Sequence, residues 1–397
     1  MHRLAGVTVA ILLAACPAAA AKPGDLDRAF GNGGVASTAL LDGGWHGLVQ
    51  RDGRIVIAGG VQDPGLWRLM PGGRRDVRFG RGGVADAGRG GLPFDLRRVR
   101  GELRVGLRTV TVNEPPIALL RFEARGRRLQ TAVHEPFFPG PLSDGFLRPD
   151  GGAYVNSFSS GVRAVRPDGS LDTAFSGGTL ENGDLPGWRD VQVAAVRRDG
   201  RILARARRAG EPHLLLLTPD GQLDPAFGGG DGAAEVPFPP AVVRFLRGGD
   251  IAAASSRGRF IVRVFRLSRS GARRGSFGRR GVAGTWTIGR RYEDVRDLVE
   301  DARGRLYALA VNRVFALSRS GRRLRGFGRR GVSRRPRAAR RSTYVASDLA
   351  VHRRRGLIVV GTEYVGNPAH PGLGGCYDIR EDFCAEDVGA VAWRVRR

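Results

Sequence analysis

Lysine is almost absent from this chain of 397 residues: Lys22 is the only one, so 64 of the 65 basic residues are arginine. Surfaces that bind phosphate or nucleic acid normally mix the two residues, because lysine is also a good phosphate ligand. The bias therefore indicates the codon usage of a GC-rich genome more than a nucleic-acid partner, and none is expected. The 38 acidic residues still leave a formal charge of +27, which attracts polyanions.

The chain also lacks an apolar segment long enough to span a bilayer, which takes about 20 residues. The apolar run at 4–15 has only twelve residues, follows the basic His2 and Arg3, and precedes four alanines at 18–21. This order is typical of an export signal, so we predict a signal peptide over residues 1–21. The mature protein is then secreted or lipid-anchored at the outer face of the cell membrane.

Two cleavage routes remain open. Residues 13–16, Leu-Ala-Ala-Cys, resemble a bacterial lipobox, in which Cys16 is lipidated and becomes the first mature residue. Cleavage after Ala21 would instead discard Cys16.

Cysteine is scarce, and only Cys376 and Cys384 lie outside the signal region. In an exported protein, two cysteines this close in one loop predict a disulfide. A metal site would need CxxC spacing or nearby histidines, and His370 is the single candidate. We therefore expect the cystine to hold a loop together, and we predict that Cys376→Ser leaves the rest of the fold intact.

Sustained helical periodicity is missing too, so helix content is expected to be low. Glycine is abundant instead, with 61 residues, about twice the usual share of roughly 7%. A Phe-Gly unit followed by Gly-Val recurs, with variations, about every fifty residues, and one copy near Ala132 is degenerate; its phenylalanines are Phe30, Phe79, Phe175, Phe227, Phe277 and Phe327. A turn glycine between two short apolar runs recurs seven times, at Gly53, Gly101, Gly151, Gly200, Gly249, Gly304 and Gly356. Such turns indicate hairpins.

Each repeat therefore holds four strands, which we label A to D. Strands A and B flank the turn glycine, C is an apolar run that often carries an arginine, and D follows the Phe-Gly unit. This pattern predicts an all-β fold, a seven-bladed β-propeller over residues 22–397 with four antiparallel strands per blade. The chain begins with a D strand and stops after a C strand, so we expect the N-terminal strand to close the last blade and leave no free edge. A loop insertion at 362–388 lengthens that blade.

The repeat resembles the delta-60 repeat of bacterial exported proteins. Residues 24–31 and 50–59 carry its pattern almost intact, and residues 168–175 and 220–227 match as well. The copies near 123–135 and 272–277 depart most, which puts the packing of those blades in doubt. The resemblance implies an exported or surface β-propeller and brings no characterised catalytic residues with it.

An aspartate stands three residues before the repeat phenylalanine in four copies: Asp27, Asp76, Asp172 and Asp224. Calcium binding is one interpretation of this recurrence. Capping of backbone N–H groups in a tight turn is the favoured one, because the same structural position repeats.

Strand order places the B–C and D–A loops on one face, and these loops differ from blade to blade. We predict that this variable-loop face binds a ligand. Its candidate residues are Trp45, His46, Phe94, Trp188, Trp286, Tyr292, Tyr344, Tyr377 and Phe383. Five aspartates just before strand A could ring a mouth of the central channel, where they would hold a cation or, as we favour, cap the strand; they are Asp95, Asp144, Asp190, Asp294 and Asp348.

The opposite face gathers arginines in the C–D connections of two successive blades. The predicted basic patch consists of Arg273, Arg274, Arg279, Arg280, Arg322, Arg323, Arg329 and Arg330. No aromatic residues for base stacking are interleaved with them, so anionic envelope polymers or lipid headgroups are the expected partners. Adhesion through such exposed charges should be strongly salt-dependent.

Catalytic motifs are missing: the sequence has no GxSxG elbow, HExxH motif or P-loop. We therefore assign no catalytic residue, cofactor or metal. The favoured function is a monomeric binding or scaffold module for an extracellular or cell-envelope ligand, which could be a protein, a glycan or an anionic polymer. The alternative is a propeller enzyme of the lyase or glycosidase type, with His46 and the mouth carboxylates as acid and base.

Overall fold

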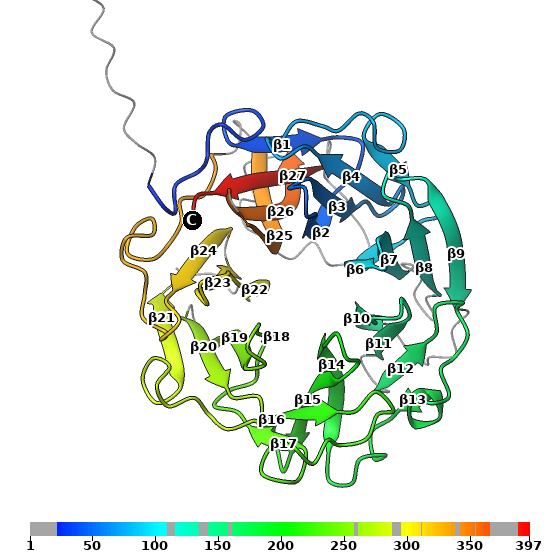
Figure 1. The fold of residues 1–397 in the computed structure, drawn as a ribbon, viewed down its shortest axis with the longest axis vertical. Coiled ribbons are helices and arrows are strands. Elements are labelled where there is room, and N and C mark those ends of the chain that lie inside the picture. The colour runs from blue at the N-terminus through cyan, green and yellow to red at the C-terminus, as the bar shows by residue number, and fades with distance from the viewer. Residues whose placement is uncertain are drawn as a thin grey trace, which may run out of the picture.

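Seven separate sheets surround one central axis in the computed structural model of the chain (Figure 1). The structure describes residues 22–108, 116–134, 142–157, 161–257, 261–287, 295–310, 312–337, 342–353, 355–365 and 388–397. The strands within each sheet are antiparallel and, in the first five blades, follow one another in chain order. The predicted seven-bladed β-propeller is thus confirmed.

Each blade runs from an inner A strand to an outer D strand. Blade 1 consists of β2 (Gly44–Val49), β3 (Ile55–Gly59), β4 (Gly65–Leu69) and β5 (Val84–Asp86). Blade 2 consists of β6 (Leu92–Val99), β7 (Glu102–Arg108), β8 (Ile117–Phe122) and β9 (Arg128–His134). Blade 3 consists of β10 (Leu142–Leu147), β11 (Ala153–Ser157), β12 (Val162–Val165) and β13 (Thr179–Leu180), preceded by the 3-10 turn η1 (Ser176–Gly178). Blade 4 consists of β14 (Arg189–Val196), β15 (Ile202–Arg208), β16 (Glu211–Leu217) and β17 (Ala233–Glu235).

The remaining blades complete the ring. Blade 5 consists of β18 (Val242–Phe245), β19 (Ile251–Arg257), β20 (Ile261–Leu267) and β21 (Val282–Thr287). Blade 6 consists of β22 (Asp297–Glu300), β23 (Leu306–Ala310) and β24 (Arg313–Leu317). Its D position holds a single bridge between Phe315 and Val332. Blade 7 consists of β25 (Ser342–His352), β26 (Gly356–Val365), β27 (Val388–Val395) and β1 (Val35–Thr38).

The ring closes as predicted, through the N-terminal strand. In Figure 1 the blue β1 lies along the red β27, and the two strands pair from Val35 opposite Trp393 to Thr38 opposite Ala390. Among the described residues, no helix is long and apolar enough to cross a membrane.

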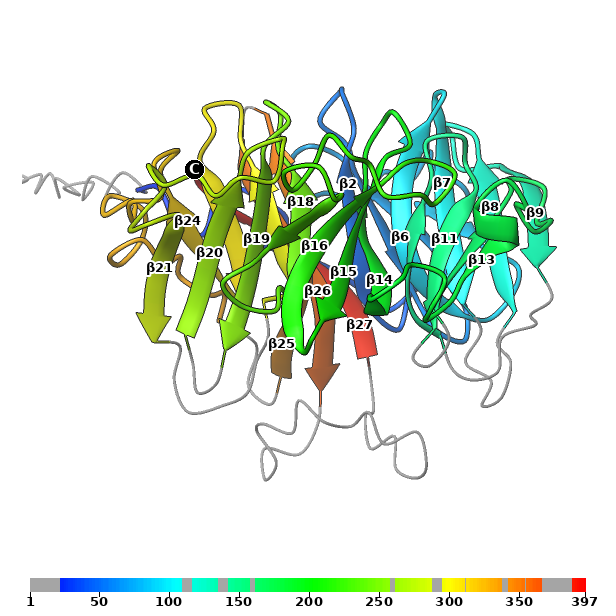
Figure 2. The same ribbon diagram turned by 90° about the horizontal axis from the view of Figure 1, so that it is seen from below.

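The strands run between two faces of the disc (Figure 2). Because the strands alternate in direction, the A–B turns and C–D connections lie together on one face, which we call the turn face. The B–C and D–A loops lie on the other, which we call the loop face.

The repeat phenylalanines fill the space between neighbouring blades, and all six are fully buried or nearly so. The residue that follows the phenylalanine is a glycine in five copies and Ser176 in the sixth. Its N–H is donated to the C–D turn of the next blade, as Gly80 donates to Arg125 at 2.8 Å and Gly228 to Ser270 at 2.9 Å. At the closure, Gly328 donates to Pro23 at 2.7 Å. The Phe-Gly unit therefore joins each blade to its neighbour.

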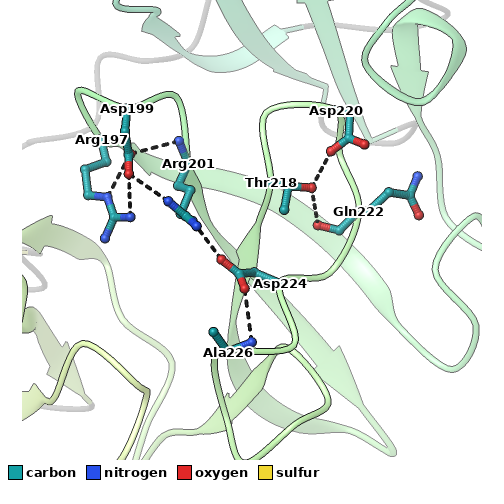
Figure 3. A network of polar contacts seen from close by, with 8 residues as sticks. All are labelled: Arg197, Asp199, Arg201, Thr218, Asp220, Gln222, Asp224 and Ala226. Carbon is teal, nitrogen blue, oxygen red and sulfur yellow. Dashed lines mark hydrogen bonds and ion pairs between the residues drawn. The ribbon is translucent and has the colours of Figure 1, made fainter.

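The aspartate three residues before the phenylalanine is a cap and also half of an ion pair. In blade 4, Asp224 accepts the N–H of Ala226 at 3.0 Å and the guanidinium of Arg201 at 2.7 Å (Figure 3). In blade 1, Asp76 pairs in the same way with Arg68 of strand C at 2.9 Å. The capping interpretation is confirmed, and the arginine partners add a link between the D strand and the rest of the blade.

Candidate functional site

A ring of polar side chains occupies one position on the innermost strand of most blades. The members are His46, Asp95, Asp144, Gln192, Val242, Asp297 and Asp348. They are structurally equivalent because, in blades 1–6, each pairs with the strand-B residue that stands five places after the turn glycine. Four aspartates and a histidine thus face the axis together, and we call this set the central ring.

Three of the aspartates hold neighbouring blades together. Asp95 accepts the N–H of Leu147 in the next blade at 2.8 Å, and Asp348 accepts that of Gly47 at 2.6 Å. Asp297 likewise accepts the N–H of Leu349 at 3.0 Å. Inner strands of different sheets cannot pair with each other, so these carboxylates satisfy backbone groups that would otherwise lack partners.

His46 and Asp144 are the ring members with spare hydrogen-bonding capacity. Asp144 accepts only the N–H of Gly145 at 2.8 Å, and His46 has no hydrogen-bond partner among the described residues. Burial lowers the pKa of His46, although Asp95, Asp144 and Asp297 oppose the effect. Burial also raises the pKa of Asp144. His46 is therefore neutral at pH 7, with one nitrogen that donates and one that accepts.

The carboxyl groups of Asp297 and Asp348 lie in hydrogen-bond contact beside an arginine. The Arg244 guanidinium lies 2.6 Å from Asp297, and Asp348 hydrogen-bonds the same carboxyl group. Burial, opposed by Arg244 and reinforced by the charge of Asp348, raises the pKa of Asp297 to about 7. The side chain of Asp297 is 3% exposed, while that of Arg244 is 39% exposed although protein surrounds it. A side chain can be surrounded by protein and still be exposed when it faces an interior space that solvent reaches, as Arg244 does.

The ring corrects part of the sequence prediction. Asp95, Asp144 and Asp348 belong to it, but Asp190 stands two residues before the ring position of blade 4, where its side chain is 66% exposed and lies 3.6 Å from Arg207. Asp294 lies outside the described residues, and Asp297 takes the equivalent place. Within the described ranges, no group of three or more His, Cys, Asp or Glu side chains is arranged to hold a metal ion.

Several predicted loop-face aromatics pack inside the fold. Phe94 is 5% exposed and lies so close to Gly106 and Gly145 that neither position has room for a Cβ atom. Trp188 packs edge-on against His213, with ring centres 5.0 Å apart, and is also buried. These contacts are those of core residues, and they leave Phe94 and Trp188 little surface for a partner.

The other predicted aromatics differ in position. Trp286 is buried against Phe315 at 5.2 Å. Tyr344 is half-buried, 6.0 Å from the ring of Trp393. Trp45, also half-buried, directly precedes His46, and its Nε1 is buried without an acceptor among the described residues. Three predicted binding residues lie outside the described residues, as do the predicted disulfide and lipidation sites: Tyr292, Tyr377, Phe383, Cys376, Cys384 and Cys16.

The eight arginines of the predicted basic patch are all exposed. Arg274 is engaged, because it donates to Asp250 at 2.7 Å. Arg323 stacks over Trp286 at 5.1 Å. None of the other six pairs with a carboxylate of the described chain. The turn face is thus strongly positive in blades 5 and 6, while its role in binding stays a prediction.

Sequence reasoning missed Asp297, Arg205 and Arg244. Asp297 could have been found by counting back seven residues from the turn glycine, because His46, Asp144 and Asp297 all stand at that distance. No comparable signal marks the arginines. Arg205 lies on strand B of blade 4, and Arg244 stands two residues beyond the ring position in blade 5.

Comparison with known proteins gives a short family match. Residues 50–79 match the family described as "Domain of unknown function (DUF5122) beta-propeller". The match covers part of one repeat, from the first A–B turn through strands B and C to the following phenylalanine, and supports a bacterial β-propeller family. No curated protein matches the chain.

Solved structures with similar folds are distant. A protein of unknown function from Bacteroides caccae is 17% identical, with 61% of this chain and 87% of that one covered and a TM-score of 0.36. The extracellular domain of a putative one component system from B. thetaiotaomicron is 11% identical; the match covers 83% of this chain, only 38% of that one, and has a TM-score of 0.40. The WD40 domain of Toxoplasma gondii coronin is 9% identical, with 91% and 86% covered and a TM-score of 0.47.

Proposed function

We propose that this protein is an exported propeller of the delta-60 type that binds a polar ligand of the cell envelope at its central ring, reached from the loop face. The observation that carries the proposal is the unequal use of the ring. Asp95, Asp297 and Asp348 bond neighbouring blades, whereas His46 and Asp144 keep free donor and acceptor capacity in an enclosed position.

The chemistry of these two groups favours an uncharged ligand rich in hydroxyl or amide groups. A neutral imidazole can both donate and accept, and a carboxylate accepts two hydrogen bonds from hydroxyl groups. Arg205 and Arg244 offset the negative charge around them. A glycan fits this set better than a cation does.

The test uses the full-length protein immobilised and exposed to envelope extract of the producing cell, with captured molecules identified by mass spectrometry. Affinity for the captured ligand is then measured for His46→Ala and Asp144→Asn. A tenfold or greater loss is expected for each, which corresponds to one or two hydrogen bonds. Asp231→Asn removes an exposed carboxylate on the outer part of blade 4 and serves as the control. Equal capture by all three variants would exclude the central ring as the binding site.

A second candidate function rests on Asp297. A carboxyl group with a pKa of about 7 can act as a general acid at neutral pH, and Asp348 beside it can act as a base. Conversion of the captured ligand by the native protein, abolished in Asp297→Asn, would support an enzyme of the lyase or glycosidase type. Recovery of the unchanged ligand after prolonged incubation supports binding alone.

A further inference from the structure

Two adjoining cavities lie on the turn face beside blades 6 and 7, with volumes of about 820 and 440 Å³. Arg305, in the A–B turn of blade 6, lines both of them. The larger is also lined by Arg322, Arg323 and Arg325 of the C–D connection. The smaller is also lined by Arg303, Arg355, Arg396 and Arg397. Eight guanidinium groups therefore line the two cavities, which share Arg305 and which we together call the arginine pockets.

The carboxylates near this space are already used. Asp27 accepts Arg394 at 2.7 Å and Arg396 at 3.3 Å. Asp301 lies 2.7 Å from Arg305 and 3.7 Å from Arg397. No carboxylate of the described chain pairs with the other five arginines, which are Arg303, Arg322, Arg323, Arg325 and Arg355. Five positive charges are thus left without a counter-charge.

Blade 6 differs from five of the six other blades at the position that supplies a counter-charge in them. In four blades an aspartate stands three residues before the repeat phenylalanine, and in blade 5 Arg274 stands there and is neutralised by Asp250. In blade 6 the position is Leu324, whose N–H donates to Ala316 of strand C as Asp76 donates to Arg68 in blade 1. The excess of positive charge is therefore built into this blade and is not a general property of the repeat.

Some of the donors are buried and unsatisfied. Arg396 Nε and Arg397 Nη1 have no hydrogen-bond partner among the described residues. Buried donors without acceptors are rare and unfavourable, and phosphate oxygens are strong, often bidentate acceptors for guanidinium groups. Arg323 is also held over the ring of Trp286, which fixes part of the pocket wall.

From this arrangement we propose that the arginine pockets bind a ligand that carries two or more phosphate groups. A phosphate monoester has about −1.5 to −2 charges at pH 7, so two or three such groups match five free arginines, while a single one does not. The site lies on the face opposite to the loop face and does not depend on the central ring.

The experiment titrates the full-length protein with inorganic tripolyphosphate in a calorimeter at 0.15 M salt, where exposed charges are screened within about 8 Å. Two double variants each remove two arginines from one cavity. Arg322→Gln with Arg325→Gln changes the larger cavity, and Arg303→Gln with Arg355→Gln changes the smaller one. The matched control, Arg247→Gln with Arg269→Gln, removes the same charge from exposed positions in the A–B turn and the C–D connection of blade 5. Circular dichroism shows that each variant is folded.

We expect micromolar binding of tripolyphosphate, at least 30-fold tighter than that of orthophosphate. Each pocket variant should weaken it at least tenfold, and the control no more than twofold. An equal loss in the control, or no binding at 0.15 M salt to either tripolyphosphate or phosphatidylglycerol vesicles, would overturn the proposal. Co-sedimentation with those vesicles distinguishes the sources: loss in the pocket variants alone assigns the phosphates to a lipid surface, and tripolyphosphate binding without co-sedimentation assigns them to a soluble ligand.

Discussion

Blades 4 and 5 contain the same ion pair with its charges exchanged. In blade 4, Arg201 follows the turn glycine and Asp224 stands three residues before the repeat phenylalanine, 2.7 Å apart. In blade 5, Asp250 follows the turn glycine and Arg274 stands before the phenylalanine, also 2.7 Å apart. The carboxylate is 6% exposed in both blades although it comes from opposite ends of the pair.

The exchange shows that this place in the two blades holds an ion pair, and that either of the two positions can supply the carboxylate. The carboxylate is the smaller group and takes the buried place, while the guanidinium reaches it from the surface on a longer side chain. Blade 5 therefore departs from the repeat pattern without losing its anchor, and Phe277 remains 2% exposed. The doubt that the sequence raised about this blade does not apply to its packing.

The largest effect is expected when the pair in blade 4 is broken by like charges. Asp224→Arg places two guanidinium groups together in a buried position, and we expect a loss of about 5 kcal/mol, the upper end for a broken buried pair. The double variant Arg201→Asp with Asp224→Arg copies blade 5 and should regain about half of that loss. Full recovery is not expected, because Asp199 lies beside position 201. Urea unfolding measures both; a double variant no more stable than Asp224→Arg contradicts the exchange.

A smaller difference should separate the two native pairs. Asp250→Ala leaves both Arg266 and Arg274 without their carboxylate, and a loss of about 3–4 kcal/mol is expected. Asp224→Ala should cost about 1–3 kcal/mol, because Arg201 keeps its contact with Asp199. Asp63→Ala, an exposed position, is the control for thermal unfolding. Equal losses in the two blades would mean that the second arginine of blade 5 contributes nothing.

Acid should weaken the ion pairs of both blades in the same pH range. Burial opposes ionisation of Asp250 and Asp224, but their arginine partners outweigh it and hold both pKa values below the usual range. A lowered folded pKa gives stability that is present above the unfolded pKa of about 3.9 and is lost as pH falls through the folded value. Urea midpoints should therefore drop below about pH 4, with a shallower drop in Asp250→Asn. If the urea midpoint of Asp250→Asn falls with pH as that of the native protein does, protonation of Asp250 is not a cause of the acid destabilisation.

An effect of the opposite sign comes from the central ring. The pKa of Asp297 is raised to about 7, so the folded protein binds this proton more tightly than the unfolded chain does. Its contribution to stability is present below about pH 4 and is lost as pH rises toward 7. Asp297→Asn should remove this decline, which is measured as the change in urea midpoint between pH 5 and pH 8. An Asp297 carboxyl resonance that titrates near pH 4 in the folded protein would refute the assignment.

The repeat made the fold predictable, because three patterns each marked the same strand positions seven times. The Phe-Gly unit, the turn glycine and the apolar C strand act within one blade or between neighbours, so their spacing alone carries the architecture and the closure. The degenerate copy near Ala132 still forms a full strand, β9, since strand pairing tolerates the loss of the motif.

The candidate sites were less predictable for a physical reason. Asp297 and Asp348 come together across blades, and His46 of a third blade interacts electrostatically with Asp297, so their coupling depends on geometry that no local pattern encodes. Burial also separates side chains that look alike in sequence: Trp188 and Trp45 were both predicted on the loop face, yet only the first is buried. The excess positive charge of the arginine pockets depends on Leu324, which stands where four other blades have an aspartate. The only sequence signal for these pockets is therefore a missing residue.

Closure through β1 also sets the order in which the protein can assemble. The partner of Val35 is Trp393, so β1 stays unpaired until nearly the whole of the described chain has been synthesised. Blades 1 to 6 can form from local contacts in the order of their synthesis, whereas the seventh needs both ends at once. The entropy of closing so long a loop grows only with the logarithm of its length, so the delay costs time more than stability. A shortened N-terminal segment would leave β27 with an open edge in every molecule, and the exposed strand would be available to a second copy.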